Sequence, residues 1–254
     1  MPLDNWGTPL RDVLTDADVR LSVGDVNAKL QAFLASEGAV YQRPYDELID
    51  KAGGAIAPNR LEIYKKLFED LGLIFVSEGR IHLSELGKVL AESLSSAEGK
   101  VQAENVRVAA AAAAVLGRYQ LLNPTTHNRG YPEECDVLPY RAIWFALAEL
   151  GSLHWEELHR VLLRVMRSED LSKAVQTIST ARATAGYNPQ DSSSADELLG
   201  PAVYQDSDQA TRRMTPWFSA AGFGGLLIDR EPSEGASFSN CAGKGDYRAR
   251  VTGR

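Results

Sequence analysis

The chain has 254 residues, of which 44% are hydrophobic and 24% are charged, and these fractions are those of an ordinary globular protein. This length is sufficient for two domains of about 100 residues each. No apolar run approaches the roughly 20 residues that cross a bilayer, and the first residues, MPLDNWGTPLRDVL, lack the basic leader and apolar core of a secretory signal. We therefore expect a cytoplasmic protein that does not enter a membrane.

The formal net charge of −7 disfavours a strongly electrostatic nucleic-acid binder, but the charge is uneven along the chain. Residues 1–57 carry nine acids and five bases, whereas residues 203–254 carry seven bases and six acids. Local patches steer binding more than the total charge does. The acidic balance therefore weakens the case for DNA binding without excluding it.

The N-terminal part of the chain is expected to begin with an arm and two helices. Residues 1–23 are polar and rich in turn formers, which favours an arm packed on the first domain. Apolar residues at helical spacing predict a helix from Asp25 to near Gly38. A second helix is expected to follow Pro44 and to break at Gly53 and Gly54.

A third helix is predicted from Ala57 to Leu71. Pro58 suits its first turn, where a missing N–H costs nothing, and Gly72 is placed to end it with a positive φ. One apolar stripe runs along this helix and consists of Leu61, Tyr64, Leu67, Phe68 and Leu71. We expect Leu67 and Phe68 to be buried against Leu30, Phe33 and Leu48.

Two short strands and a closing helix are expected after Gly72. The run 73–76 contains β-forming apolar residues, Ser77-Glu78-Gly79 is typical of a tight turn, and residues 80–83 alternate as a returning strand. Ser84 can cap the helix that follows, with Glu85 in its first turn.

The segment APNRLEIYKKLFEDLGLIFVSEGRIHLSELGKVLAES, residues 57–93, resembles the recognition helix and wing of the winged helix-turn-helix superfamily. The order of three helices and two strands agrees with that fold. Most members of the superfamily bind duplex DNA, so the resemblance implies a recognition helix in the major groove and a wing on the phosphates.

The middle of the chain is expected to connect two domains. Residues 98–122 contain six consecutive alanines and predict a spacer helix, while residues 123–139 are punctuated by proline and glycine and predict an irregular connector. We therefore divide the chain into an N-terminal winged-helix domain at 1–98, a helical connector and loop at 99–137, and a second domain at 138–254.

The second domain is predicted to be mostly helical. Apolar spacing indicates helices at 140–150, around 158–165 and at 171–185, and residues 187–205 are expected to form a polar, mobile loop. The segment MTPWFSAAGFGGLLIDREPSEG then echoes KKLFEDLGLIFVSEG, and residues 247–252 would return as a strand. This echo resembles a second winged helix that carries an insertion. Because the echo lies at the end of the chain, we expect the chain to be part of a longer polypeptide.

The resemblance implies two sets of basic residues at a DNA interface. The first set lies on the N-terminal recognition helix and wing, where the acids Glu62, Glu69, Asp70 and Glu78 offset it, and consists of Arg60, Lys65, Lys66, Arg80 and His82. The second set surrounds the C-terminal helix and wing and is the better candidate, and it consists of Arg212, Arg213, Lys244, Arg248 and Arg250.

Three further arginines, Arg160, Arg164 and Arg167, are spaced i, i+4 and i+7 and would share one helix face. This face could contact phosphates. The alternative, which we rate slightly higher, is a solvated face in which these side chains pair with Glu156, Glu157 and Glu169.

Catalytic and metal-binding motifs are weak in this sequence. His154 and His159, five residues apart on a helix, point about 140° apart and cannot share a ligand face, so a helix start with Trp155 packed is expected. Trp144, Trp155, Trp217 and Phe218 could line a pocket for a flipped base, but core packing is favoured for most of them. Cys135 and Cys241 fit no ligand spacing, which favours free thiols. No cofactor, metal or enzyme activity is expected.

The sequence therefore predicts a mainly α protein with small β-wings, built from two winged-helix-like domains joined by a helical connector. The expected function is binding of double-stranded DNA, as a prokaryotic regulator or as the targeting or modified-base-reading part of a restriction or defence enzyme with a nuclease domain or partner protein. This last step depends on analogy of fold alone. The alternative is a protein–protein interaction scaffold built from winged helices, which suits the acidic N-terminal domain.

Overall fold

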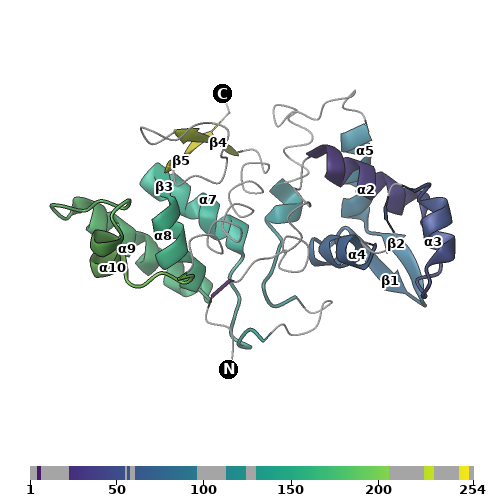
Figure 1. Cartoon of the computed structure of the whole chain (residues 1–254), viewed down its shortest axis with the longest axis horizontal. Helices are drawn as coiled ribbons and strands as arrows, with labels where there is room; N and C mark the ends of the chain where they lie inside the picture. The colour runs from purple at the N-terminus through teal and green to yellow at the C-terminus, as the bar shows by residue number, and fades with distance from the viewer. Residues whose placement is uncertain are drawn as a thin grey trace.

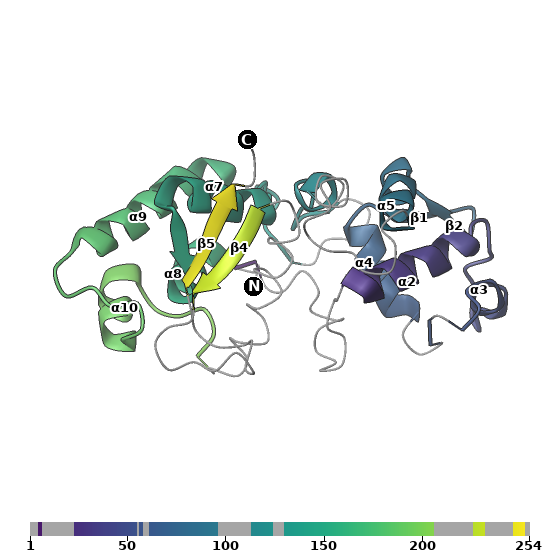
Figure 2. The same ribbon diagram turned by 90° about the horizontal axis from the view of Figure 1, so that it is seen from above.

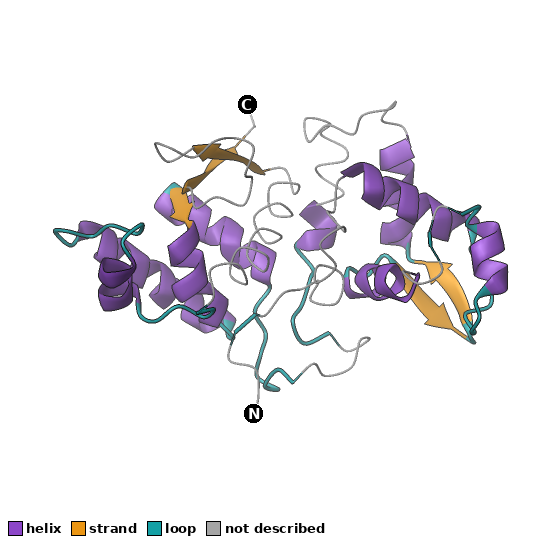
Figure 3. Cartoon of the chain, in the orientation of Figure 1, coloured by secondary structure: helices purple, strands orange, loops and turns teal. Residues whose placement is uncertain are grey.

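The structure is a computed structural model of the whole chain. It describes residues 5–6, 23–54, 56–57, 61–95, 113–123, 130–205, 226–231 and 246–251. The described part is mainly helical with small antiparallel sheets, in agreement with the predicted class. Helices and strands of residues 23–95 gather on one side of the view and those of residues 139–251 on the other, and we call these groups the first and second lobe (Figures 1 and 3).

The first lobe follows the predicted order of elements. Its helices and strands are α2 (Val23–Ala35), α3 (Asp46–Lys51), α4 (Leu61–Asp70), β1 (Ile74–Ser77), β2 (Arg80–Leu83) and α5 (Glu85–Ser95). Helix α2 begins two residues before the predicted start at Asp25. Gly72 ends α4 with a φ of 68°, and the Ser84 hydroxyl accepts a hydrogen bond from the Gly87 amide at 2.9 Å, which confirms both predicted helix boundaries. Pro58 lies outside the described residues.

The hairpin of β1 and β2 has the predicted two-residue turn. Ser77 pairs with Arg80 in an antiparallel register, so Glu78 and Gly79 are the two turn residues. Both have positive φ, 51° and 72°, which is the geometry of the primed turns whose twist matches that of the strands. A side chain at Gly79 would be strained in this conformation.

A short extended segment adds a third strand-like element to this hairpin. The Ile81 amide donates to the Ala39 carbonyl at 3.0 Å, the Gly38 amide donates to the Ile81 carbonyl at 2.8 Å, and Val40 forms an antiparallel bridge with Arg80. Residues 38–41, between α2 and α3, therefore pair with β2 on the edge opposite β1. The spatial order is residues 38–41, β2, β1.

The core of the first lobe contains the predicted residues. Five apolar side chains that the sequence assigned to this core are buried in one cluster, and these are Leu30, Phe33, Leu48, Leu67 and Phe68. The Phe33 and Phe68 rings meet edge to face with their centroids 5.4 Å apart. The predicted packing of α4 against α2 and α3 is confirmed.

The second lobe contains α7 (Pro139–Leu150), β3 (Ser152–His154), α8 (Trp155–Arg160), the 3₁₀ turns η2 (Leu162–Arg164) and η3 (Ser168–Asp170), α9 (Leu171–Ala183), α10 (Ser192–Leu199), β4 (Leu226–Glu231) and β5 (Asp246–Val251). Two predictions fail here. The helix expected around 158–165 ends at Arg160 and continues only as a 3₁₀ turn. Residues 192–199, expected within a mobile loop, form a helix, because the Asp191 carboxylate caps it and Ala195 and Leu199 are buried.

The second lobe repeats the strand order of the first. Strand β5 pairs with β4 on one edge and with β3 on the other, both antiparallel, which gives the order β3, β5, β4 (Figure 2). Strand β3, like residues 38–41, follows the first helix of its lobe and pairs with the second hairpin strand. The predicted return strand near Tyr247 is therefore confirmed, while the helix expected between Met214 and Gly222 lies outside the described residues.

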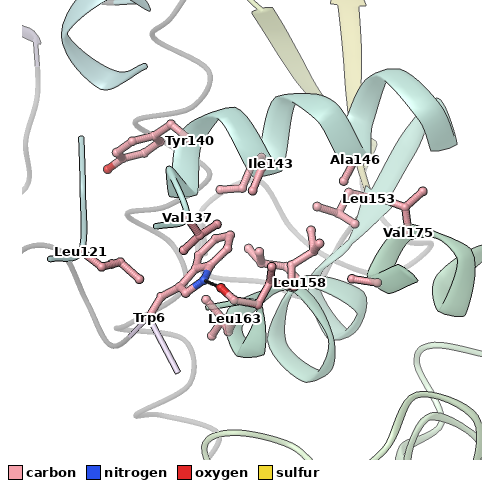
Figure 4. Close-up of a cluster of buried hydrophobic side chains, with 14 of the residues drawn as sticks. Trp6, Leu121, Val137, Tyr140, Ile143, Ala146, Leu153, Leu158, Leu163 and Val175 are labelled. Carbon is pink, nitrogen blue, oxygen red and sulfur yellow. Dashed lines mark hydrogen bonds between the residues drawn. The ribbon is translucent and has the colours of Figure 1, made fainter. Parts of the chain in front are cut away.

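The core of the second lobe includes residues that the sequence places elsewhere. Trp6, expected in an arm on the first domain, is fully buried in the second-lobe cluster (Figure 4). Leu116, Tyr119 and Leu121 of the predicted connector belong to the same cluster. The predicted spacer helix is helical at 113–116 and turns at Gly117, so its last residues, 117–122, are not helical, and residues 98–112 lie outside the described part.

Candidate nucleic-acid interface

The predicted wing residues of the first lobe are held by the lobe itself. Arg80, at the start of β2, donates from Nη1 to the carbonyl of Gly38 at 2.6 Å. The His82 ring stacks on Phe75 with centroids 5.3 Å apart, and its Nδ1 lies 3.4 Å from a Glu37 carboxylate oxygen. Both side chains therefore tie the hairpin to the residues just after α2, Glu37 and Gly38.

The bases of α4 are also engaged. The Lys65 ammonium lies 2.6 Å from the Glu69 carboxylate and 4.9 Å from the centroid of the Tyr41 ring, and its side chain is 18% exposed. Lys66 is partly buried. Arg60 lies outside the described residues. A phosphate that approached Lys65 on α4 would therefore first have to break the Lys65–Glu69 ion pair.

A cluster that the sequence did not indicate lies beside α4. Arg43 donates to one Glu62 carboxylate oxygen from Nε at 2.9 Å and from Nη2 at 2.5 Å, and the Tyr45 hydroxyl donates to the same oxygen at 2.6 Å. The Tyr45 ring stacks on Tyr41 at 4.9 Å. Side-chain hydrogen bonds from Tyr45 and Arg43 lower the pKa of Glu62. The partners are 17 and 19 residues from Glu62, so no local spacing announces them.

The predicted face of three arginines does not form. Arg160 is the last residue of α8 and its side chain is only 4% exposed, Arg164 lies in a 3₁₀ turn, and Arg167 precedes the next one. Arg160 donates to the Glu156 carboxylate at 2.8 Å, to the Gly200 carbonyl at 2.9 Å and to Asp196. Arg160 is therefore a structural residue and is removed from the candidate DNA contacts.

The other two arginines differ from Arg160 in exposure. Arg167 pairs with Glu169 at 2.5 Å, so the pairing with nearby acids that the alternative expected is found for Arg160 and Arg167, but its solvated face is not, because the Arg160 side chain is buried. Arg164 is exposed and donates from Nη2 to the Pro201 carbonyl at 3.1 Å. Arg164 therefore keeps a place among the candidates.

The C-terminal basic set is only partly within the described chain. Arg248 and Arg250 lie on β5, where Arg248 pairs with Ser152 on one side and Asp229 on the other, and Arg250 pairs with Leu227. Arg212, Arg213 and Lys244 lie outside the described residues. Two of the five predicted bases are thus placed on the central strand of the three-stranded sheet.

Helix α8 carries a buried network of charged groups. Glu157, 1% exposed, accepts hydrogen bonds from the Arg182 guanidinium, from the Tyr187 hydroxyl at 3.0 Å and from the His154 amide at 2.7 Å. Glu156 accepts from Arg160, and its second oxygen accepts from the Trp155 indole at 3.2 Å. Burial by itself disfavours the Glu156 carboxylate, yet the nearby His159, whose Nδ1 lies 3.6 Å from the Glu156 Oε2, and the charged, hydrogen-bonded Arg160 lower the pKa of Glu156 to about 2.

The two histidines of this region have structural positions. His154 caps α8, because its Nδ1 accepts from the Glu156 amide at 3.2 Å, and the packed Trp155 is 3% exposed, as the sequence predicted. The His159 Nε2 accepts from the Tyr204 amide at 2.8 Å. Within the described residues no group of three potential metal ligands occurs. Trp217 and Phe218 of the predicted aromatic pocket lie outside the described part.

Cys135 is a free, buried thiol, as predicted, and Cys241 lies outside the described chain. Among the described helices none is both long and apolar enough to cross a membrane.

No protein-family model matches the sequence, and no curated protein matches it at a significant level.

Proposed function

We propose that this chain is a tandem winged-helix protein that binds duplex DNA. The observation that carries the proposal is the shared strand order of the two lobes, residues 38–41, β2, β1 in the first and β3, β5, β4 in the second. In each lobe a helix precedes the first of these segments, further helices follow it, and an antiparallel pair of strands comes after those helices, β1 and β2 in the first lobe and β4 and β5 in the second. This order supports the proposal because it is the order expected of a winged helix, in which the paired strands would be the wing.

The charges favour the second lobe as the partner of DNA. In the first lobe, bases pair with acids of the same lobe, and these ion pairs are Arg43–Glu62, Lys51–Glu47, Lys65–Glu69 and Lys88–Glu85. Such pairs reduce the field that attracts phosphates. The candidate contacts of the second lobe are Arg164, Arg212, Arg213, Lys244, Arg248 and Arg250.

One observation favours a protein partner for the first lobe instead. Phe75 on the wing strand β1 and Val89 on α5 are 46% and 51% exposed. A surface with paired charges and exposed apolar side chains suits a protein more than a polyanion. The second candidate function is therefore a protein interaction scaffold, in which the first lobe docks a partner.

Fluorescence anisotropy of a labelled random duplex distinguishes the two functions. The titration is made at about 50 mM and about 200 mM salt, because each phosphate contact adds close to one unit to the slope of log K against log salt. DNA binding predicts measurable affinity at low salt and a steep loss at high salt. Absence of binding at low salt overturns the proposal and leaves the scaffold.

A further inference from the structure

Helix α9 differs in charge from the other labelled helices. Each of α2, α3, α4, α5, α7, α8 and α10 contains an aspartate or a glutamate, whereas α9, LSKAVQTISTARA, contains neither. Its two bases are Lys173, which is exposed, and Arg182, which belongs to the buried network. The acids Glu169 and Asp170 flank only its first turn, and Glu169 pairs with Arg167. In a chain with a net charge of −7, most of α9 therefore offers no repulsion to a polyanion.

The helix is buried along one stripe only. Its buried side chains are Ala174, Val175, Ile178 and Ala181. The opposite side, which we call the polar face of α9, is exposed and consists of Lys173, Gln176, Thr177, Thr180 and Thr184. Figures 1 and 2 both place α9 at the end of the second lobe farthest from the first lobe. The polar face is therefore accessible to a large partner.

The threonines of the polar face are fixed by the helix itself. Each donates from Oγ1 to the carbonyl four residues earlier, at 3.0 Å for Thr177, 2.8 Å for Thr180 and 3.0 Å for Thr184. These bonds use the hydroxyl proton and leave the oxygen as an acceptor and the methyl group at the surface. Threonine is a poorer helix former than alanine, glutamate or lysine, so helix stability does not explain three of them on an exposed face.

Gln176 is held in a defined position on this face. Its Nε2 donates to Thr180 Oγ1 at 3.3 Å. A side-chain amide has two N–H donors and one carbonyl acceptor, so within the described part of the chain one N–H and Oε1 of Gln176 remain for a partner. Adenine presents the matching pair in the major groove, an N6 donor beside the N7 acceptor, and glutamine can bind both at once.

We propose that the polar face of α9 enters the major groove of duplex DNA, that Gln176 reads an A·T pair there, and that Thr180 is its positioning residue. This inference rests on the proposed function. Hydroxyl, amide and methyl groups meet base edges without the repulsion that a carboxylate would meet from phosphates. Lys173, at the N-terminal end of the face, supplies a phosphate contact. Sequence preference thus comes from α9, while bases elsewhere in the lobe supply salt-dependent affinity.

The test begins with a random duplex pool, from which the full-length wild-type protein enriches a preferred site. Each A·T pair of that site is then replaced in turn by G·C, and binding is measured by fluorescence anisotropy. One replacement should weaken wild-type binding roughly tenfold and should weaken binding to Gln176→Ala by less than about twofold. The salt slope of Gln176→Ala should equal that of the wild type, because no charge is removed.

Three further variants separate reading from general affinity. Thr180→Val keeps the shape of the side chain but removes the hydroxyl, so it should lose part of the discrimination at an unchanged salt slope. Lys173→Ala should weaken all duplexes alike and lower the slope by about one unit. The matched control is Gln190→Ala, an exposed glutamine of the same lobe outside α9, which should behave as the wild type.

The outcomes distinguish this inference from the proposed function. An enriched site in which no A·T pair matters, no enrichment of any site, or full discrimination by Gln176→Ala overturns the assignment of α9 while duplex binding stands. Equal effects of Gln176→Ala and Gln190→Ala would make the polar face an ordinary solvated helix surface and would also overturn it. Absence of duplex binding at about 50 mM salt overturns the proposed function and this inference together.

Discussion

Arg182 holds Glu157 through two parallel hydrogen bonds, from Nε to Oε1 at 2.7 Å and from Nη2 to Oε2 at 2.5 Å. The same guanidinium donates to the Ser152 carbonyl at 2.9 Å and to the Leu150 carbonyl at 3.2 Å. This pair joins α9 to α8 and to the start of β3. A buried carboxylate with a bidentate partner depends strongly on that partner.

Arg182→Ala should lower the free energy of unfolding by about 3–5 kcal/mol, because Glu157 would remain buried without its counter-charge. Urea unfolding followed by circular dichroism measures this change. The control is Arg167→Ala, which breaks an exposed pair with Glu169 and should change stability by less than about 1 kcal/mol. Similar small changes in both variants would contradict the importance of the buried pair.

Stability should depend on pH through Glu156. Its pKa is lowered from 4.5 to about 2 in the folded state, so its charged form is favoured by folding. The stabilisation is fully present above pH 4.5 and is lost as the pH falls toward 2, and its size is on the order of 3 kcal/mol. Glu156→Gln should therefore be less stable than the wild type at pH 6, and the difference should shrink at pH 2 in urea titrations. A constant difference would count against the ionised carboxylate.

The packing of α4 gives a matched pair of phenylalanine variants. Phe68→Ala removes a fully buried ring that meets Phe33 and should cost about 3–5 kcal/mol. Phe75→Ala, on the neighbouring strand, removes a ring that is 46% exposed and should cost less than about 1 kcal/mol. Thermal melts of the two variants compare them directly, and equal melting temperatures would contradict this packing.

The first lobe could be predicted because its signals are local. The apolar stripe from Leu61 to Leu71, the turn at Glu78 and Gly79, and the cap at Ser84 each depend on residues a few positions apart. Helix α10 was missed although its signal is also local, since Asp191 caps it and Ala195 and Leu199 are spaced i, i+4.

The features that escaped prediction depend on long-range contacts. Trp6 finds its partners about 160 residues later, and Arg160 finds Asp196 and the Gly200 carbonyl 36 and 40 residues later. Helical spacing treats the three arginines of 160–167 alike, whereas burial separates Arg160 from the exposed Arg164. Spacing within a sequence indicates a face, but only tertiary packing determines whether that face meets solvent.

Gly87 marks a close approach between α5 and Leu73, the residue before β1. A Cβ atom at this position would lie 2.1 Å from the Leu73 carbonyl oxygen, and that oxygen also accepts a hydrogen bond from the Ser84 amide at 2.9 Å. Gly87→Ala should therefore cost about 1–3 kcal/mol or more despite the higher helix propensity of alanine. Val89→Ala, at an exposed position of the same helix, should change stability by less than about 0.5 kcal/mol. A stabilised Gly87→Ala protein in urea unfolding would show that the close approach is not made.

The proposed DNA interface is tested by replacing a basic pair in each lobe. The double variant Arg212→Ala/Arg213→Ala should weaken duplex binding and flatten the salt slope by about one unit for each phosphate that is no longer neutralised. Lys65→Ala/Lys66→Ala should do less, because Lys65 already pairs with Glu69 at 2.6 Å. Anisotropy titrations of both variants at several salt concentrations give the two slopes.

Two outcomes of this comparison would redirect the assignment. A larger effect of the lysine pair would make the first lobe the reader and would mean that DNA displaces Glu69 from Lys65. If neither pair changes the slope while duplex still binds, Arg164 is the next candidate, since it is exposed beside the Pro201 carbonyl. Arg160→Ala should alter stability rather than the salt slope, because its guanidinium is buried among Glu156, Asp196 and the Gly200 carbonyl.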